Sequence, residues 1–191
     1  TFKTNVKSIE KGIQWSEYQA RRFLKKQGVP IVPGVLVTCA PEAVSAAKKI
    51  GYPVVMKIQS EDIVHKSDVG GVGLNLQSDD EVEKTYQTMI STVKKQAAEC
   101  QIDGVLISPM RKEGTELLVG IVKDPLWGPV LAVGLGGVFV EVLKDTSLRV
   151  LPVSHDEIVT MLEELRGAAI LKGTRGYPAV DVDQVAEVIE K

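Results

Sequence analysis

The sequence contains few of the features that mark several common classes of protein. Its 191 residues include only two cysteines, Cys39 and Cys100, which are far apart and form neither a metal-binding nor a redox spacing, so a reduced cytoplasmic protein is the simplest interpretation. The formal net charge of -2 provides no positive field for nucleic acid or for an anionic membrane. No apolar run approaches the roughly 18 residues of a membrane span. We therefore expect neither nucleic acid nor a membrane among its partners.

Hydrophobic residues make up 44% of the chain and charged residues 25%, which is ordinary for a globular protein that buries one core or two small lobes. The chain begins at Thr1 rather than Met and stops inside an expected helix, as a piece of a longer polypeptide would. Residues 1–14 are polar and basic without a clear period, which indicates an arm or linker.

Hydrophobic spacing and helix signals predict the order of the elements. Three Ser-x-x-Glu/Gln capping boxes, at Ser16, Ser78 and Ser154, each open a helix. The expected helices are 16–27, 41–50, 79–98, 155–166 and one from Asp181, and the expected strands are 35–37, 54–58, 70–76, 105–107, 117–122, 130–133 and 138–143. Consecutive strands in the second half argue against a parallel doubly wound sheet. They favour an α+β arrangement of two small lobes with a cleft between them.

Lys57 is the single charge in the apolar strand 54–58. Alternation places Val54, Met56 and Ile58 on one face of this strand and Lys57 on the other. A lysine among apolar neighbours needs an anionic partner or an exit to solvent. The strand alone leaves both open.

His65 lies in the connection that follows, directly before Gly70, Gly71 and Gly73. A neutral imidazole can accept a phosphoryl group on nitrogen, and glycines let backbone N–H groups approach a phosphate closely. The segment matches neither the Gly-Lys-Ser/Thr phosphate loop nor a dinucleotide fingerprint. An exposed turn histidine beside a glycine hairpin therefore remains an equal interpretation.

Further candidates lie in the second half. Ser108, Pro109 and Met110 form a hinge that could present backbone groups to an adenine edge, and Glu116 could accept from ribose hydroxyls; a plain hairpin is the alternative. Glu141 is an inward strand carboxylate that needs a cationic or metal partner, with Lys57, Lys144 and Arg149 as candidates. The loop at 172–178, which holds Lys172 and Arg175, suits a phosphate-contacting lid or an ordinary solvated loop. His155 is expected at the surface beside a helix cap.

From about Trp15 to the end, these segments resemble the ATP-grasp portion of the ADP-forming acyl-CoA synthetases, the acetate–CoA ligase type related to the succinyl-CoA synthetase β subunit. The resemblance is carried, in order, by 54–57, 63–72, 116–120, 124–129, 134–145 and 172–176. It implies an ATP-grasp fold of two α/β lobes with a nucleotide cleft between them. The expected division is an arm or linker at 1–14, a first subdomain at 15–103, and a second at 104–191 that is truncated at its C-terminus.

The resemblance also implies an activity, in which acyl-CoA, ADP and phosphate exchange for a free acid, CoA and ATP through phosphohistidine relays. His65 would be the second phosphohistidine, which carries the phosphoryl group between a CoA-binding domain or subunit and the nucleotide. Lys57 would contact nucleotide phosphates, and Gly70 and Gly71 would form a phosphate-covering loop. The remaining implied contacts are Ser108 to Met110 at the adenine, Glu116 at the ribose, and Glu141, Asp145 and Arg175 around the phosphates.

The sequence departs from the resembled family in two ways. No Asp-x-Asn-Pro pattern for Mg²⁺ follows Asp181, so the metal ligands are expected outside this chain, and the CoA-binding part is missing. We expect the chain alone to be inactive in net synthesis, while weak nucleotide binding stays open.

Two other functions remain as alternatives. One is a non-catalytic, synthetase-like regulatory domain of a protein acetyltransferase, although such a domain has no chemical need for His65 and Lys57. The other is a carboxylate–amine ligase of the wider ATP-grasp group, which would form no phosphohistidine.

Overall fold

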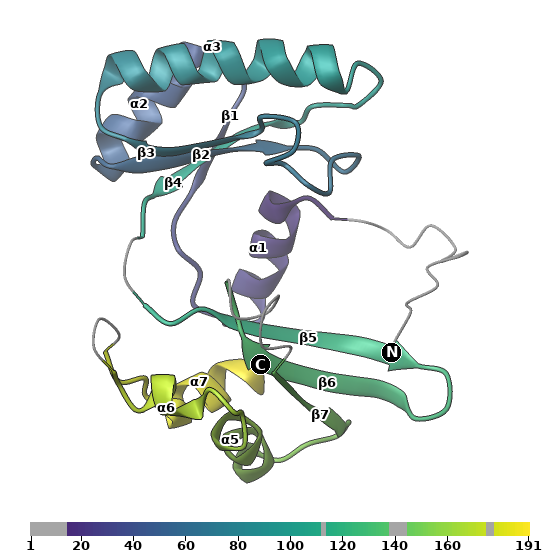
Figure 1. The fold of residues 1–191 in the computed structure, drawn as a ribbon. Coiled ribbons are helices and arrows are strands. Elements are labelled where there is room, and N and C mark those ends of the chain that lie inside the picture. The colour runs from purple at the N-terminus through teal and green to yellow at the C-terminus, as the bar shows by residue number, and fades with distance from the viewer. Residues whose placement is uncertain (1–14, 112–113, 138–144, 175–177) are drawn as a thin grey trace. The chain divides into compact units, whose positions relative to one another are not determined.

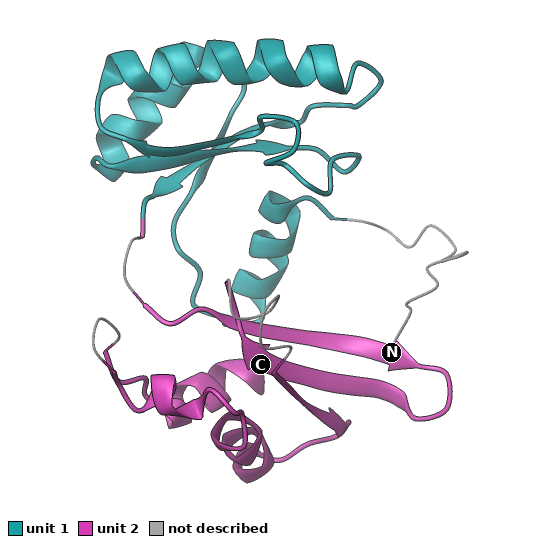
Figure 2. Ribbon diagram, in the orientation of Figure 1, with its two compact units in different colours: residues 1–110 teal, residues 111–191 magenta. Residues whose placement is uncertain are grey.

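The computed structural model describes residues 15–111, 114–137, 145–174 and 178–191, and these form two compact units, 1–110 and 111–191 (Figure 2). The predicted boundary after residue 103 falls before strand β4 (Gly104–Pro109), but β4 pairs antiparallel with β1 (Val35–Val37) and β2 (Val54–Gln59). The first unit therefore extends to Met110.

The first unit is a four-stranded antiparallel sheet in the order β1-β4-β2-β3, with β3 at Val72–Leu76. Helices α2 (Ala40–Ile50) and α3 (Asp79–Gln96) cover one face of the sheet (Figure 1). The predicted alternation in β2 is confirmed, because Val54, Met56 and Ile58 are fully buried in the core beneath these helices. The intervening residues of β2 are consequently available to the opposite face.

Helix α1 (Glu17–Lys26) lies on that opposite face (Figure 1). Its predicted capping box is confirmed: Ser16 Oγ accepts from the Gln19 N–H, and the Gln19 side chain accepts from the Ser16 N–H. None of the residues of α1, all of which the structure describes, is buried. Hydrogen bonds from Tyr18 to Gln59 and from Gln19 to Glu61 connect this helix to the rest of the unit.

The second unit is a three-stranded antiparallel sheet in the order β5-β6-β7, formed by β5 (Leu117–Asp124), β6 (Gly128–Leu135) and β7 (Thr146–Val150). Its core consists of apolar residues from β6 and from α5 (His155–Glu163), α6 (Ala168–Leu171) and α7 (Val182–Ile189). The expected strand at 138–143 lies outside the described residues, whereas β7 and the four-residue helix α6 were not predicted. No helix in the described part of the chain has the length and apolar character needed to cross a membrane.

Candidate functional site

The connection between β2 and β3 holds His65 at the start of a tight turn. The Asp68 N–H donates to the His65 carbonyl over 3.2 Å, and the Gly71 N–H donates to the Lys66 carbonyl over 2.7 Å. The turn is fixed to β2, because the Ile58 N–H donates to the Gly71 carbonyl over 2.8 Å. His65 itself is exposed, and its ring has no hydrogen bond or ion pair with any described residue. The imidazole is thus presented to solvent from a backbone that is locally well braced.

The two glycines of this turn have structural reasons of their own. A Cβ at Gly71 would lie 2.5 Å from Cγ2 of the fully buried Ile58, and Gly70 adopts a φ of +68° that side chains disfavour. Their N–H groups are already used, since Gly70 donates to Ser67 and Gly71 to Lys66. In this conformation neither N–H is free to cradle a phosphate, and the predicted phosphate contact of the glycines stays a prediction.

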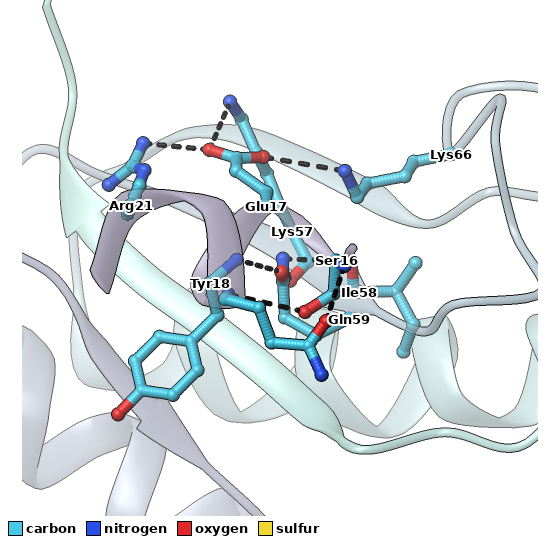
Figure 3. A network of polar contacts seen from close by, with 9 residues as sticks. Ser16, Glu17, Tyr18, Arg21, Lys57, Ile58, Gln59 and Lys66 are labelled. Atoms are coloured by element: carbon cyan, nitrogen blue, oxygen red, sulfur yellow. Dashed lines mark hydrogen bonds and ion pairs between the residues drawn. The ribbon is translucent and has the colours of Figure 1, made fainter. Parts of the chain in front are cut away.

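Lys57 has the anionic partner that its position in β2 requires. Its Nζ lies 3.2 Å from Oε1 of Glu17, the first residue of α1 (Figure 3). The other carboxylate oxygen of Glu17 lies 3.4 Å from Lys66 Nζ, and Arg21 Nη2 lies 2.7 Å from Oε1. We call Glu17, Arg21, Lys57 and Lys66 the Glu17 cluster. It is a concentration of three cations around one carboxylate, beside the turn that carries His65.

Burial of Glu17 opposes its ionisation, but the attraction of Lys57, Arg21 and Lys66 outweighs that effect and lowers the pKa of its carboxyl below the ordinary 4.5. Helix α1 is fastened next to the cluster, because the Tyr18 N–H donates to Oε1 of the buried Gln59 over 2.9 Å and Gln19 Nε2 donates to Glu61 over 2.7 Å. Glu17 is therefore ionised at neutral pH, and the helix that carries it is held in place by hydrogen bonds beside the cluster.

Sequence reasoning missed Glu17, Arg21 and Lys66. The spacing of Glu17 and Arg21 is that of an i, i+4 helix pair and could have been noticed. An acidic residue in the first turn of a helix, however, is already explained by the helix dipole. Nothing in the sequence pairs Glu17 with a lysine 40 residues further on.

Ser108 lies near the end of β4, and Met110 directly follows that strand. Ser108 is buried and lies opposite Val55 of β2 in the antiparallel register. The Met110 N–H donates to the Pro53 carbonyl over 3.0 Å. An adenine contact through the Met110 N–H would thus have to share or open this bond, and the predicted hinge role stays a prediction.

Glu116 precedes β5 in the second unit and is exposed. Its carbonyl accepts from the Gly136 N–H over 2.6 Å, and a Cβ built on Gly137, whose φ is +60°, would lie 2.7 Å from Oε2 of Glu116. The two glycines therefore leave room for the Glu116 side chain against the end of β6.

The structure describes only some of the other charged candidates in the second half of the chain. Glu141 and Arg175 lie outside the described residues. Asp145 is buried and its carboxylate accepts from the Gly167 N–H over 2.8 Å, while its predicted phosphate contact stays a prediction. Of the proposed partners of Glu141, Lys57 pairs with Glu17 and Arg149 with Glu164.

The described side chains do not form a metal centre. Among them, no group of three or more His, Cys, Asp or Glu residues is placed to hold an ion. The described donor set therefore does not fit a resident Mg²⁺.

Comparison with known proteins identifies the family. The model of the family described as "ATP-grasp domain" matches residues 8–191. The chain belongs to the ATP-grasp family. Among curated proteins, this ATP-grasp chain is 39% identical to the β subunit of acetate–CoA ligase [ADP-forming] I of Pyrococcus furiosus, over 92% of the chain and 75% of that subunit. It is 42% identical to the 4-hydroxybutyrate–CoA ligase [ADP-forming] of Nitrosopumilus maritimus, over 92% of the chain but only 25% of that protein.

Solved structures agree. The dinucleotide-forming acetyl-coenzyme A synthetase 1 of Ca. Korarchaeum cryptofilum, in complex with coenzyme A, Ca-AMPCP and HgCl+, superimposes with a TM-score of 0.86 at 39% identity, over 92% of this chain and 76% of that one. A second structure of that synthetase, with coenzyme A and Mg-AMPPCP, matches with a TM-score of 0.75 at 37% identity, over 92% and 76% of the two chains. In that structure the phosphohistidine segment points towards the nucleotide-binding site. The predicted ATP-grasp fold is thereby confirmed.

The ATP-grasp chain thus spans about a quarter of the ligase from Nitrosopumilus and about three quarters of the β subunit from Pyrococcus. The relatives that carry the likeness are ligases, and they lend no support to the alternative of a regulatory domain in an acetyltransferase.

Proposed function

We propose that this chain is the nucleotide-binding part of an ADP-forming acid–CoA ligase, in which acyl-CoA, ADP and phosphate yield a free acid, CoA and ATP. The observation that carries the proposal is the placement of His65: an exposed imidazole on a braced turn, beside the lysines of the Glu17 cluster, in a chain 39% identical to a β subunit of such a ligase. A carrier of phosphoryl groups needs an accessible imidazole and nearby positive charge, and both are present in the first unit.

In the proposed step, an imidazole nitrogen of His65 attacks the phosphorus of a phosphohistidine on the CoA-binding part. One N–P bond forms as the other breaks, and the donor histidine is left neutral. The terminal phosphate oxygen of ADP then attacks the same phosphorus, the bond to His65 breaks, and ATP and a neutral His65 result. Lys57 and Lys66 would stabilise the charge on the transferring group by hydrogen bonds from their ammonium groups.

The nucleotide contacts are part of the same proposal. We assign Lys57 to the phosphates, Gly70 and Gly71 to the loop that covers them, Ser108 and Met110 to the adenine, and Glu116 to the ribose. Glu141 and Arg175 would add charge contacts around the phosphates. Mg²⁺ would accompany the nucleotide, as the Mg-AMPPCP of the related synthetase suggests, with ligands beyond the described residues. The partner would be a CoA-binding domain or subunit, and a cytoplasmic setting stays a prediction from the cysteine content.

Labelling of the complete enzyme with γ-labelled ATP in the presence of Mg²⁺ tests the role of His65. We expect acid-labile, base-stable label, and we expect His65→Ala to reduce both label and steady turnover to background because the acceptor nitrogen is gone. The chain has only one other histidine, so His155→Ala is the matched control and should keep both. Undiminished label or turnover in His65→Ala would remove His65 from the reaction, and base-labile label would point to an acyl phosphate instead.

A further inference from the structure

We propose that Glu17 is a positioning residue, whose carboxylate gathers Lys57 and Lys66 into one phosphate-binding pair beside the turn that carries His65. This inference rests on the proposed function, in which these lysines meet phosphate. It concerns a residue that touches the lysines and not the substrate.

The geometry of the Glu17 cluster is the first support. Lys57 comes from β2, Lys66 from the turn that follows His65, and Glu17 from the first turn of α1. Each lysine takes a different oxygen of the same carboxylate, at 3.2 Å and 3.4 Å (Figure 3). One carboxylate therefore fixes the distance between two ammonium groups that the backbone supplies from separate segments.

The charge of the cluster is the second support. Three cations surround one anion, so a positive excess remains after the carboxylate is counted. Glu61, another carboxylate beside α1, accepts from Gln19 and forms no ion pair with either lysine of the cluster. The cluster thus attracts a further anion instead of being neutralised by Glu17.

The number of N–H donors on each lysine allows Glu17 and a phosphate to be bound at the same time. A lysine ammonium carries three N–H donors, and within the described part of the chain each of the two lysines uses one of them on Glu17. Two donors on each ammonium remain for phosphate oxygens. Glu17 therefore does not have to leave for a phosphate to bind.

The energetic reason for such a residue is conformational entropy. A free lysine side chain loses rotamer entropy when it is held in one position, and two ammonium groups at close range repel each other. The lysines of the cluster are only 32% and 20% exposed, so solvent screens this repulsion incompletely. With Glu17 in place, the loss of rotamer entropy and the repulsion between the two ammonium groups are already offset in the folded protein before the nucleotide binds. This is what preorganisation of a binding site means.

The test compares variants of the complete enzyme in their dissociation constants for ADP and for adenosine, measured by titration calorimetry. We expect Glu17→Gln to raise the Kd for ADP about 10-fold while the Kd for adenosine stays within about 2-fold, because only ADP carries phosphates. Glu17→Asp keeps the charge and should restore part of the ADP affinity. Thermal melting checks that each variant is folded. If Glu17→Gln does not fold, the Kd values of Glu17→Asp for ADP and adenosine are compared with those of the wild type, and only the Kd for ADP should be raised.

Glu61→Ala is the matched control, because Glu61 also ties α1 to the start of the same connection, through Gln19, but does not contact the lysines. It should bind ADP like the wild type. The inference is overturned if Glu17→Gln binds ADP normally, if ADP and adenosine weaken equally, or if Glu61→Ala reproduces the loss. If instead the wild type does not bind ADP, or if Lys57→Ala binds it as well as the wild type, the proposed function itself fails.

Discussion

At the scale of single residues, Gly71 shows how packing and a ligand-binding motif can demand the same residue. The sequence suggests a glycine that approaches phosphate. In the structure, a Cβ at this position would lie 2.5 Å from Ile58 Cγ2 and 2.9 Å from the Lys66 carbonyl oxygen. Both neighbours are hard to move, because Ile58 is fully buried and the carbonyl already accepts the Gly71 N–H. The turn that presents His65 therefore depends on Gly71 even without a ligand.

We predict that Gly71→Ala destabilises the protein by about 1–3 kcal/mol, the usual cost of overpacking a core. Urea unfolding followed by circular dichroism measures this. Gly120→Ala is the control, since a Cβ there meets no atom within 4 Å among the described residues and the change should stay within about 0.5 kcal/mol. Equal stability of Gly71→Ala and wild type would mean that the turn moves away from Ile58 at no cost.

The lowered pKa of Glu17 predicts that the stability of the protein depends on pH in the acidic range. The pKa of its carboxyl is lowered in the folded protein, so its ion pairs stabilise the fold above about pH 4.5 and lose that contribution as the pH falls through the folded value. The difference in unfolding free energy between wild type and Glu17→Gln should accordingly be constant near neutral pH and shrink below pH 4.5. Urea titrations between pH 3 and 7 measure it. A difference that does not change with pH would show that the carboxylate contributes through packing alone.

At the scale of elements, helix starts could be predicted best because capping is local. The boxes at Ser16 and Ser154 are both complete. At Ser78 only half of the predicted box forms, since the Glu81 carboxylate accepts from the Gln77 N–H instead of the Ser78 N–H. The box prediction is wrong in that respect, although α3 still begins at Asp79.

Strand β7 could not be predicted because its polarity is inverted. Ser147 is buried, whereas Leu148 and Val150 are exposed. The apolar side chains of β7 therefore face away from the core, and the only strand that the sequence predicts in this region is the apolar run at 138–143, which lies outside the described residues. The Glu17 cluster was missed for a related reason, since its members are brought together by the fold and not by spacing.

His155 at the start of α5 contacts carboxylates in and directly after α7. These contacts predict a second dependence of stability on pH. The ring nitrogens of His155 lie 3.4 Å from Glu190 and 3.5 Å from Asp183, and the Glu190 hydrogen bond, followed by that of Asp183, raises the pKa of His155 above 6.5 against the effect of desolvation. A raised pKa means that the contribution is complete below pH 6.5 and is lost as the pH rises through the folded value.

Stability measured between pH 5.5 and 8.5 should thus fall with rising pH in the wild type, and more weakly in His155→Gln. Glu190→Gln should weaken the fall of stability with rising pH more than Asp183→Asn does, because Glu190 has the larger effect on the pKa of His155. An unchanged pH profile in all three variants would show that the α5–α7 contact does not depend on the charge of His155.

At the scale of the whole molecule, the described residues form two hydrophobic cores with no member in common. One contains apolar residues of the β1–β4 sheet and its helices, and the other those of β6, α5, α6 and α7. The sequence predicts two lobes, but it places β4 in the second because β4 is followed directly by more strands. Pairing of β4 with β1 and β2 is long-range and invisible to local patterns.

The proposed nucleotide contacts are distributed over both units: Lys57, Ser108 and Met110 in the first, and Glu116 in the second. A ligand stabilises the regions that it contacts relative to their locally opened states. We therefore predict that saturating ADP slows amide hydrogen exchange in β2 and β4 and also at the start of β5. Adenosine should retain protection near β4 and β5 but lose the part in β2 that depends on phosphate contact with Lys57. If ADP slows hydrogen exchange only in the first unit, Glu116 does not bind the ribose. A ribose held by the Glu116 carboxylate should also slow exchange in the backbone next to Glu116.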